Sequence, residues 1–395
     1  MSSDARQRQL AEAAALKFHH LGFHQVSMAD LAATVGVTAP AIYRHYSDKQ
    51  SLLAAAISTG LDEVEVALAE LESISWPAAL GRLAATAITR RDLWILLQRE
   101  LRHLDPARRA PITERFSVIV ARLDTALADA APDLDADTLA LRLTAALAVL
   151  SSPSLYRLDM PTDDYTHLLA GAATAASLTE LQGTPATSRR FRPSAQAKVA
   201  AGEYQRSVQS ESSRSEELLR TSLELFHERG YAAVSLDDIG ARLGMAGPSI
   251  YYHFATKADL LVTAFTRATE WLSASHSGAG TPPDLDELVR GYVDLGVRER
   301  LLFGVYVLEA INLPPTVGRR IRQSLDRDIA AWSDALALTR PELTVQQRLV
   351  LVQAARAVVN DVVRVGHFHD RDEIAEELRD LAWSVLCAEP LAVQA

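Results

Sequence analysis

Residues 18–53 read FHHLGFHQVSMADLAATVGVTAPAIYRHYSDKQSLL, and residues 226–261 repeat this pattern as FHERGYAAVSLDDIGARLGMAGPSIYYHFATKADLL. The fold follows from this repeated segment. The offset is 226 − 18 = 208 residues without a gap, and 15 of the 36 aligned positions are identical. Solenoid repeats are only about 20–50 residues long. A repeat at this spacing therefore indicates two whole subunits joined in one chain.

Glycines and capping residues divide the first copy into short helices. The apolar pattern through Phe18 predicts a helix that ends at Gly22, because glycine readily adopts a positive φ. Ser27, with Asp30 three residues later, is close to a capping box and predicts a second helix that ends at Gly36.

The next segment predicts a third and a fourth helix. Thr38 can cap the third helix, with Pro40 in its first turn, where proline is tolerated. Ser47 and Gln50 form a further cap pair before the fourth helix. Two short helices joined by a turn that contains glycine form a helix-turn-helix, whose second helix enters the major groove of DNA.

Side chains of the third helix have the chemistry of phosphate contacts. Thr38, Tyr43 and His45 carry hydroxyl and imidazole donors. Lys49 lies in the first turn of the next helix, where the positive end of the helix dipole also favours phosphate.

Other side chains of the same helix suit base edges. Ala39, Pro40 and Ala41 are small, so they let the helix approach the bases and can contact thymine methyl groups. Arg44 can reach a guanine or a phosphate.

Composition favours an all-α fold. Apolar residues make up 48% of the chain and aromatic residues only 6%, whereas strands need β-branched and aromatic residues. Cys387 is the only cysteine, which excludes an internal disulfide and a cysteine zinc site. The start MSSDARQRQL is polar and no apolar run reaches about 18 residues, so we expect a cytoplasmic protein without membrane contact.

The net charge of −10 is a weak argument against a nucleic-acid partner, because the positions of Lys and Arg matter more than their sum. Residues 1–60 hold five basic and four acidic side chains, a balance of +1, whereas residues 210–270 hold six and nine, a balance of −3. The second copy therefore has the less favourable field for DNA.

Turn and linker signals divide the chain into five regions. We expect a first head at residues 1–56, a first helical body at 57–181, a polar linker at 182–213, a second head at 214–264 and a second helical body at 265–395.

The runs GVTAPAIYRHYSDKQSLL and GMAGPSIYYHFATKADLL resemble the TetR family of bacterial transcription regulators. The resemblance covers about 50 residues in each half and extends further only as a helical pattern. It implies a three-helix DNA-binding head on a helical effector-binding body, and a repressor that leaves its operator when a small molecule binds.

The resemblance also assigns roles to positions. Phosphate-holding positions are Ser27, Thr38, Tyr43, His45 and Lys49, and base-facing positions are Ala39, Pro40, Ala41 and Arg44. The matching positions of the second copy are Ser235, Gly247, Pro248, Ser249, Tyr251, Tyr252, His253 and Lys257.

The second copy departs from the first at the positions that matter for DNA. Ala246 replaces Thr38, which removes a capping oxygen worth about 1 kcal/mol. Tyr252 replaces Arg44, and Asp237 stands near the start of the second helix, where it can repel a phosphate. We expect the second head to bind more weakly or to recognise different bases, and hence an asymmetric operator.

In the TetR family the last two helices of each subunit pair into a four-helix bundle. Here these helices correspond to residues 137–151, 163–181, 344–366 and 371–388. We expect them to pair within one chain, so that a monomeric chain acts as a pseudo-dimer.

The same resemblance places an effector pocket in each body. The candidate lining residues are aromatic and polar: Trp94, Gln98, Phe116 and Tyr156 in the first half, and Phe303, Tyr306, Trp332 and Asn360 in the second. Ordinary core packing is the alternative for each, and one of the two pockets can be filled and silent.

Catalytic motifs are absent, so no enzyme, cofactor or metal site is predicted. His367 and His369 have ligand spacing but no partner cysteine or further histidine cluster. Two function classes stay open: a DNA-binding regulator, and a ligand- or partner-binding regulator in which one or both heads no longer bind DNA.

Overall fold

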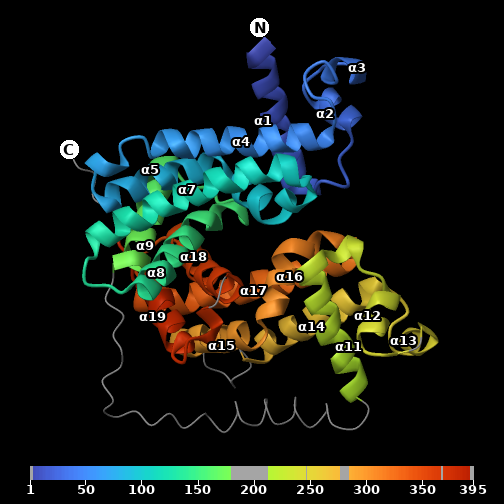
Figure 1. Ribbon diagram of the computed structural model, residues 1–395. Helices are drawn as coiled ribbons and strands as arrows, with labels where there is room; N and C mark the ends of the chain where they lie inside the picture. Colours follow the sequence, from blue (N-terminus) through green and yellow to red (C-terminus); the bar gives the residue numbers. More distant parts are fainter. Residues whose placement is uncertain (1–2, 179–211, 246, 276–283, 366–367, 392–395) are drawn as a thin grey trace. The chain divides into compact units, whose positions relative to one another are not determined.

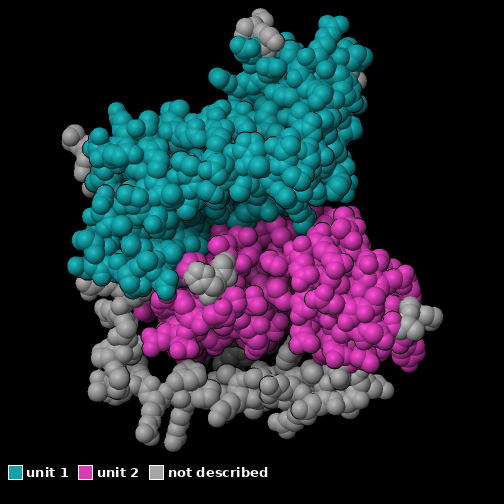
Figure 2. All heavy atoms as spheres, viewed as in Figure 1, with its two compact units in different colours: residues 1–179, 353–358, 384–395 teal, residues 180–352, 359–383 magenta. Residues whose placement is uncertain are grey.

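Helices form all the regular secondary structure of the described residues, which in the computed structural model are 3–178, 212–245, 247–275, 284–365 and 368–391. The all-α fold class is thereby confirmed. The expected linker lies outside the described residues up to residue 211, and Ser212 begins the next helix. The chain forms two compact units: unit 1 is residues 1–179, 353–358 and 384–395, and unit 2 is residues 180–352 and 359–383 (Figure 2).

The first half begins with two long helices and two short helices between them. These are α1 (Ser3–Leu21), α2 (Met28–Thr34), α3 (Ala39–Ile42) and α4 (Lys49–Ala67). The helices that follow are α5 (Trp76–Thr89), α6 (Arg91–Ile95), α7 (Pro106–Ala130), α8 (Ala136–Ser151) and α9 (Thr162–Leu178). Shorter turns are η1 (Leu71–Ser73), η2 (Leu96–Glu100), η3 (Leu101–His103) and η4 (Ser152–Ser154). Figure 1 shows α1, α2 and α3 gathered at one end of α4.

The second half repeats this order. Its head comprises α11 (Ser212–Arg229), η5 (Tyr231–Ala233), α12 (Leu236–Arg242), α13 (Gly247–His253) and the long α14 (Lys257–Ser275). Its body comprises α15 (Leu285–Arg298), α16 (Arg300–Glu309), η6 (Ala310–Asn312), α17 (Pro315–Thr339), α18 (Val345–Arg364), η7 (Phe368–Asp370) and α19 (Ile374–Leu386).

The structural register of the two bodies can be fixed from helix starts. Helices α15, α17 and α18 begin 285 − 76, 315 − 106 and 345 − 136 residues after α5, α7 and α8, which is 209 in each case. Helix α14 begins 257 − 49 = 208 residues after α4. A residue of the first half therefore has its counterpart 208 positions later in the head and in the long helix, and 209 positions later in the body.

Local capping explains the head fold. Phe18 and Phe226 are fully buried at the ends of α1 and α11, and Gly22 follows the first of these helices at φ 76°. Ser27 and Asp30 form the expected capping box of α2, and Gly36 ends the segment at φ 69°. These expectations from the first copy are confirmed.

Two details of the third and fourth helices differ from expectation. Thr38 is the N-cap of α3, but its side chain makes no capping hydrogen bond. The cap pair of α4 is Asp48 and Ser51, one residue later than the expected Ser47 and Gln50, because the Asp48 carboxylate accepts from the Ser51 amide at 2.7 Å. The Gln50 side chain instead accepts a hydrogen bond from the Asp105 amide at 2.8 Å.

The long helices cross the expected domain boundaries. The boundary drawn between residues 56 and 57 falls inside α4, and that between 264 and 265 falls inside α14. Each head is therefore joined to its body by one continuous helix. The four helices expected near residues 137–151, 163–181, 344–366 and 371–388 are present as α8, α9, α18 and α19.

The end of the chain packs within unit 1. The Leu391 amide donates to the His167 carbonyl of α9 at 3.0 Å. A Cβ added to Gly171 of the same helix would overlap the Glu389 carbonyl oxygen. The close approach of the two backbones at this point requires glycine.

Candidate functional site

The first head exposes a small polar surface around the end of α3. Thr38, Pro40 and Arg44 are exposed, and His45 is half-buried. Tyr43, at the C-cap of α3, leaves 53% of its surface in solvent. The surroundings of the Ala39 side chain lie outside the described part of the chain. A large aromatic ring held in the open by a rigid frame is available for a partner.

The second head exposes more aromatic surface on a longer helix. Tyr251 and Tyr252 of α13 are 52% and 89% exposed, and Ser249 is exposed beside them. The His253 ring nitrogen Nδ1 lies 3.2 Å from the Ser215 hydroxyl of α11. Ala246 lies outside the described residues, and the exposure of Gly247 and Pro248 is not described.

Two expected phosphate positions are occupied by helix caps. The Ser27 hydroxyl accepts from the Asp30 amide at 3.1 Å and donates to the Asp30 carboxylate at 2.6 Å. Ser235 and Asp238 repeat both bonds in the second head. These hydrogen bonds lower the pKa of both carboxyls, so each serine lies beside a negative charge.

The two expected phosphate-binding lysines make contacts inside the protein. The Lys49 ammonium donates to the carbonyls of Phe23 and Val26 at 2.7 and 2.9 Å, and lies 4.2 Å from the centre of the Phe23 ring. Lys257 donates to the Tyr231 carbonyl and lies 4.2 Å from that ring. Partial burial lowers the pKa of both lysines. Both ammonium groups therefore hold the turn after the first head helix.

A buried carboxylate joins each body to its head. Glu100 and Glu309, 209 positions apart, are each only 1% exposed. Glu100 accepts from the Phe23 amide at 2.9 Å, and Glu309 accepts from the Tyr231 amide at 3.1 Å. Each joint thus consists of a body carboxylate and a head lysine that bind the same turn.

The first joint has an additional guanidinium. Arg99 donates to Glu100 and also to the carbonyls of Phe18 and His19, at 2.8 and 2.7 Å. These carbonyls lie at the end of α1, where unpaired backbone acceptors need donors. Leu308 occupies the matching position of the second half.

The body of the first half contains a narrow cavity of about 90 Å³. Trp94 and Phe116 line it, as expected, together with Leu83, Leu123 and Ser151. Gln98 and Tyr156 are not among its lining residues, and their role at an effector stays a prediction. The lining includes Leu93 and Leu97, which flank the start of the π-helical turn η2 that ends at Glu100.

Large side chains fill the corresponding region of the second half. Tyr292, Phe303, Trp332 and Asn360 stand where the first half has Leu83, Trp94, Leu123 and Ser151. The Tyr292 hydroxyl donates to Asn360 at 2.7 Å, and its ring packs against Phe303 and Trp332 at centroid distances of 5.5 and 5.8 Å.

The four residues expected in the second pocket are packed against other side chains, and their ligand role stays a prediction. Trp332 is 1% exposed, and Tyr306 packs edge-on against Phe265 at 5.3 Å. Trp332 is buried, whereas Phe303, Tyr306 and Asn360 are half-buried. Tyr292, Trp332 and Asn360 are larger than Leu83, Leu123 and Ser151 at the matching positions, and Phe303 is smaller than Trp94.

Among the described residues, no helix is long and apolar enough to span a membrane. Within the same part of the chain, no three His, Cys, Asp or Glu side chains are grouped as metal ligands. His367 lies outside it, and His369 pairs with Asp370 at 3.3 Å.

The chain thus has two helix-turn-helix heads, and each is followed by a helical body. This architecture is typical of DNA-binding regulatory proteins. The family model described as bacterial regulatory proteins of the tetR family matches residues 10–56 and again residues 218–264. The chain therefore carries two head domains of the tetR family in tandem.

Individual relatives match parts of the chain. The HTH-type transcriptional activator FasR of Mycolicibacterium smegmatis is 32% identical over 79 residues, which are 20% of this chain and 36% of that protein. The chain thus spans about a third of the length of this curated relative.

Solved structures of single subunits are similar to part of the chain. A TetR-family regulator from Bordetella parapertussis 12822 has a TM-score of 0.40 and 16% identity, over 44% of this chain and 94% of that one. The ketosteroid regulator KstR2 of Mycobacterium tuberculosis has a TM-score of 0.39 and 22% identity, over 45% and 94%.

Proposed function

We propose that this protein is a DNA-binding transcriptional regulator whose two heads recognise unlike half-sites of one operator. The observation that carries the proposal is the matched pair Tyr43 and Tyr251. Both rings are about half exposed, at 53% and 52%, whereas the matched pair Phe18 and Phe226 of the same heads is fully buried. A tyrosine hydroxyl held at that position suits a phosphate oxygen.

The residues next to these tyrosines support unlike half-sites. Arg44 and Tyr252 are matched positions, and both are exposed. A guanidinium makes a bidentate contact with guanine, whereas a tyrosine ring offers one hydroxyl and apolar surface. The two heads therefore present different chemistry to the bases.

The first joint supports release by a small molecule. Leu93, Trp94 and Leu97 line the cavity. The same segment of the chain continues into Arg99 and Glu100, which bind the first head. A ligand that enlarges this cavity of about 90 Å³ must displace that segment. Displacement of Glu100 frees the Phe23 amide, which changes the angle of the head and weakens its grip on DNA. In this proposal the protein acts as a repressor.

A one-chain pseudo-dimer is part of the same proposal. Residues 353–358 of α18 and 384–395 at the chain end belong to the compact unit that holds residues 1–179. This membership supports pairing of α8, α9, α18 and α19 within one chain. A chain that contains both heads needs no second copy to bind a two-part operator.

Selection of bound sequences from random DNA tests the proposal. We expect an asymmetric consensus, because Arg44 and Tyr252 differ. A palindrome would contradict the pseudo-dimer, since it requires two copies of the same head. Absence of enrichment would favour the second function class, a ligand- or partner-binding regulator, for which the acidic balance of the second head is the specific support.

Matched variants of the two tyrosines test their role. Tyr43→Phe and Tyr251→Phe remove one hydroxyl each without changing the ring. We expect Tyr43→Phe to weaken operator binding about threefold to tenfold across all sequences, as loss of one phosphate contact does. The measurement is fluorescence anisotropy at fixed salt. Arg44→Gln is the control, because it should also relax specificity at one base position.

A further inference from the structure

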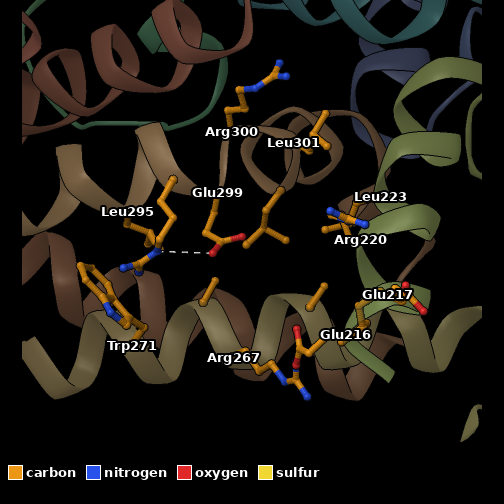
Figure 3. Close-up of a pocket in the computed structure, with 15 residues that line it drawn as sticks. Glu216, Glu217, Arg220, Leu223, Arg267, Trp271, Leu295, Glu299, Arg300 and Leu301 are labelled. Carbon is orange, nitrogen blue, oxygen red and sulfur yellow. Dashed lines mark hydrogen bonds and ion pairs between the residues drawn. The ribbon is translucent and has the colours of Figure 1, made fainter. Parts of the chain in front are cut away.

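A cavity of about 550 Å³ lies within unit 2, between the head helix α11, the long helix α14 and the junction of α15 with α16. Its floor is apolar and includes Leu223, Leu295 and Leu302, and Trp271 stands at one end (Figure 3). A volume of this size is typical of sites for small organic molecules. It is about six times the volume of the cavity in the first half.

Most of the charges around this cavity are already compensated. Arg267 pairs with Glu216, and Glu217 pairs with Arg214 at 2.8 Å. Arg298 lies 3.4 Å from Glu299, and its guanidinium lies 5.1 Å from the centre of the Trp271 ring. The acidic side chains therefore each have a cation.

Arg220 of α11 and Arg300 of α16 are the exceptions on the cavity wall. Both are exposed, and no hydrogen bond or ion pair joins either of them to another residue in the described part of the chain. In Figure 3 the Arg300 side chain extends away from the other labelled side chains. The wall thus presents Arg220 as an uncompensated guanidinium beside an apolar floor.

The first half closes the same place with an ion cluster. Arg90 pairs with Glu63 at 2.6 Å and with Asp92 at 2.8 Å, and its side chain is only 10% exposed. The counterparts of Arg90, Glu63 and Asp92 are Glu299, Trp271 and Leu301. All three members of the cluster are exchanged in the second half.

This exchange is not a simple repacking. A buried ion cluster can be replaced by apolar residues of similar volume at little cost in stability. Here the new residues leave a large space, whose walls lose packing contacts. A cavity with one ring, an apolar floor and unmatched arginines in its wall has the features of a binding site rather than of a filled core.

We propose that this cavity binds a small amphipathic monoanion, an apolar body that carries one carboxylate. The leucines and Trp271 would receive the apolar body, and Arg220 would receive the carboxylate, because a guanidinium binds carboxylates through two parallel hydrogen bonds. The site is separate from the effector cavity of the proposed function, which lies in the first half. Its occupant bridges α11 of the second head and α16 of the body.

Fluorescence and calorimetric titrations of the full chain test the site. The probes are octanoate and 4-phenylbutyrate, which distinguish an aliphatic from an aromatic body, and 1-octanol is the uncharged control. We expect saturable binding of at least one carboxylate, with a change in tryptophan fluorescence that is lost in Trp271→Phe. Arg220→Gln should weaken carboxylate binding about tenfold and leave 1-octanol binding unchanged.

Three outcomes would overturn the proposal. The first is no saturable binding of either carboxylate. The second is a fluorescence change on binding that persists in Trp271→Phe, together with loss of binding in Leu123→Trp, a variant that fills the cavity of the first half. The third is equal affinity for octanoate and 1-octanol in both the unmodified chain and Arg220→Gln, which would show that no anion is recognised. Arg220 is exposed on a helix, and glutamine has a similar helix propensity, so the variant should fold.

Discussion

The two head–body joints share one design and differ in how many polar groups hold it. Both keep the buried glutamate and the lysine that bind the turn after the first head helix. The first joint adds Arg99, and it adds two further ties: Arg108 to Asp48 at 2.8 Å and the Asp105 amide to Gln50 at 2.8 Å. These bonds cannot form in the second half. The positions of Arg99, Arg108, Asp48 and Gln50 are there occupied by Leu308, Val317, Thr256 and Ala258, in that order.

The two bodies differ in where they contain a cavity and in how large it is. The first body keeps a narrow cavity beside a heavily bonded joint, and the second fills that place with rings while opening a larger cavity at the joint. Duplication thus preserved the backbone frame and moved the empty space. The comparison teaches that cavity position, rather than helix order, distinguishes two copies of one fold.

The largest expected effect tests the filled body of the second half. Trp332→Ala should lower the stability of unit 2 by about 3–5 kcal/mol, because it removes a buried ring and leaves a cavity. Urea titration followed by peptide-level hydrogen exchange reports the two units separately. The control is Leu338→Ala, at a position 71% exposed. A loss below about 1 kcal/mol at Trp332 would contradict close packing around Tyr292.

The second prediction compares the two buried glutamates directly. Glu100→Gln leaves the buried Arg99 without its carboxylate, so we expect a loss of about 2–3 kcal/mol in unit 1. Glu309 accepts from the amides of Tyr231 and Asn312, and Leu308 stands at the position of Arg99, so Glu309→Gln should cost about 1 kcal/mol. The same exchange measurement applies to both variants. Equal losses would show that Arg99 does not distinguish the joints.

The smallest prediction concerns pH, because only the first joint contains a titrating side chain at this position. Burial, followed by the neighbouring Arg102, lowers the pKa of His103 to about 4, whereas its counterpart Asn312 does not titrate. Between about pH 6.5 and pH 4 the unfolded histidine binds a proton that the folded one does not, so the stability of unit 1 falls as pH falls through this window.

Replacement of His103 by the residue of the second half isolates this effect. His103→Asn should reduce the loss of unit 1 stability between pH 7 and pH 5 by about 1 kcal/mol. Unit 2 in the same samples is the internal control, and thermal unfolding with exchange readout is the measurement. An unchanged loss in the variant would assign the pH dependence to other groups, such as His19, whose pKa is also lowered by burial.

Sequence predicted the features that depend on neighbouring residues. Ser27 with Asp30, Gly22 and Gly36 act over three or four residues, so their roles follow from spacing alone. Trp94 and Phe116 were placed at a cavity from residue type and helix position. The same reasoning could not show that Phe303 and Trp332 pack against Tyr292, because whether rings line a space or fill it depends on the summed volume of residues far apart in sequence.

The joints were beyond sequence reasoning for a related reason. Glu100 and Phe23 are 77 positions apart, and Arg99 reaches carbonyls 80 and 81 positions away. Lys49 has the pattern of a phosphate contact, but a long flexible amine binds whichever acceptors lie nearest in the fold. One signal was available: the glutamate recurs at a 209-residue offset in both bodies, inside an otherwise divergent region.

The packing of the chain end against α9 has a consequence for synthesis. Residues 384–395 complete the unit that residues 1–179 begin, and the Leu391 to His167 bond joins positions 224 apart. During translation the first half emerges long before the segment that covers Gly171 exists. Translation proceeds at about 5–20 residues per second, so α9 stays without its last contacts for roughly 10–40 seconds. A ribosome that stalls in the second half leaves an unfinished surface, which makes the first half dependent on complete synthesis of the chain.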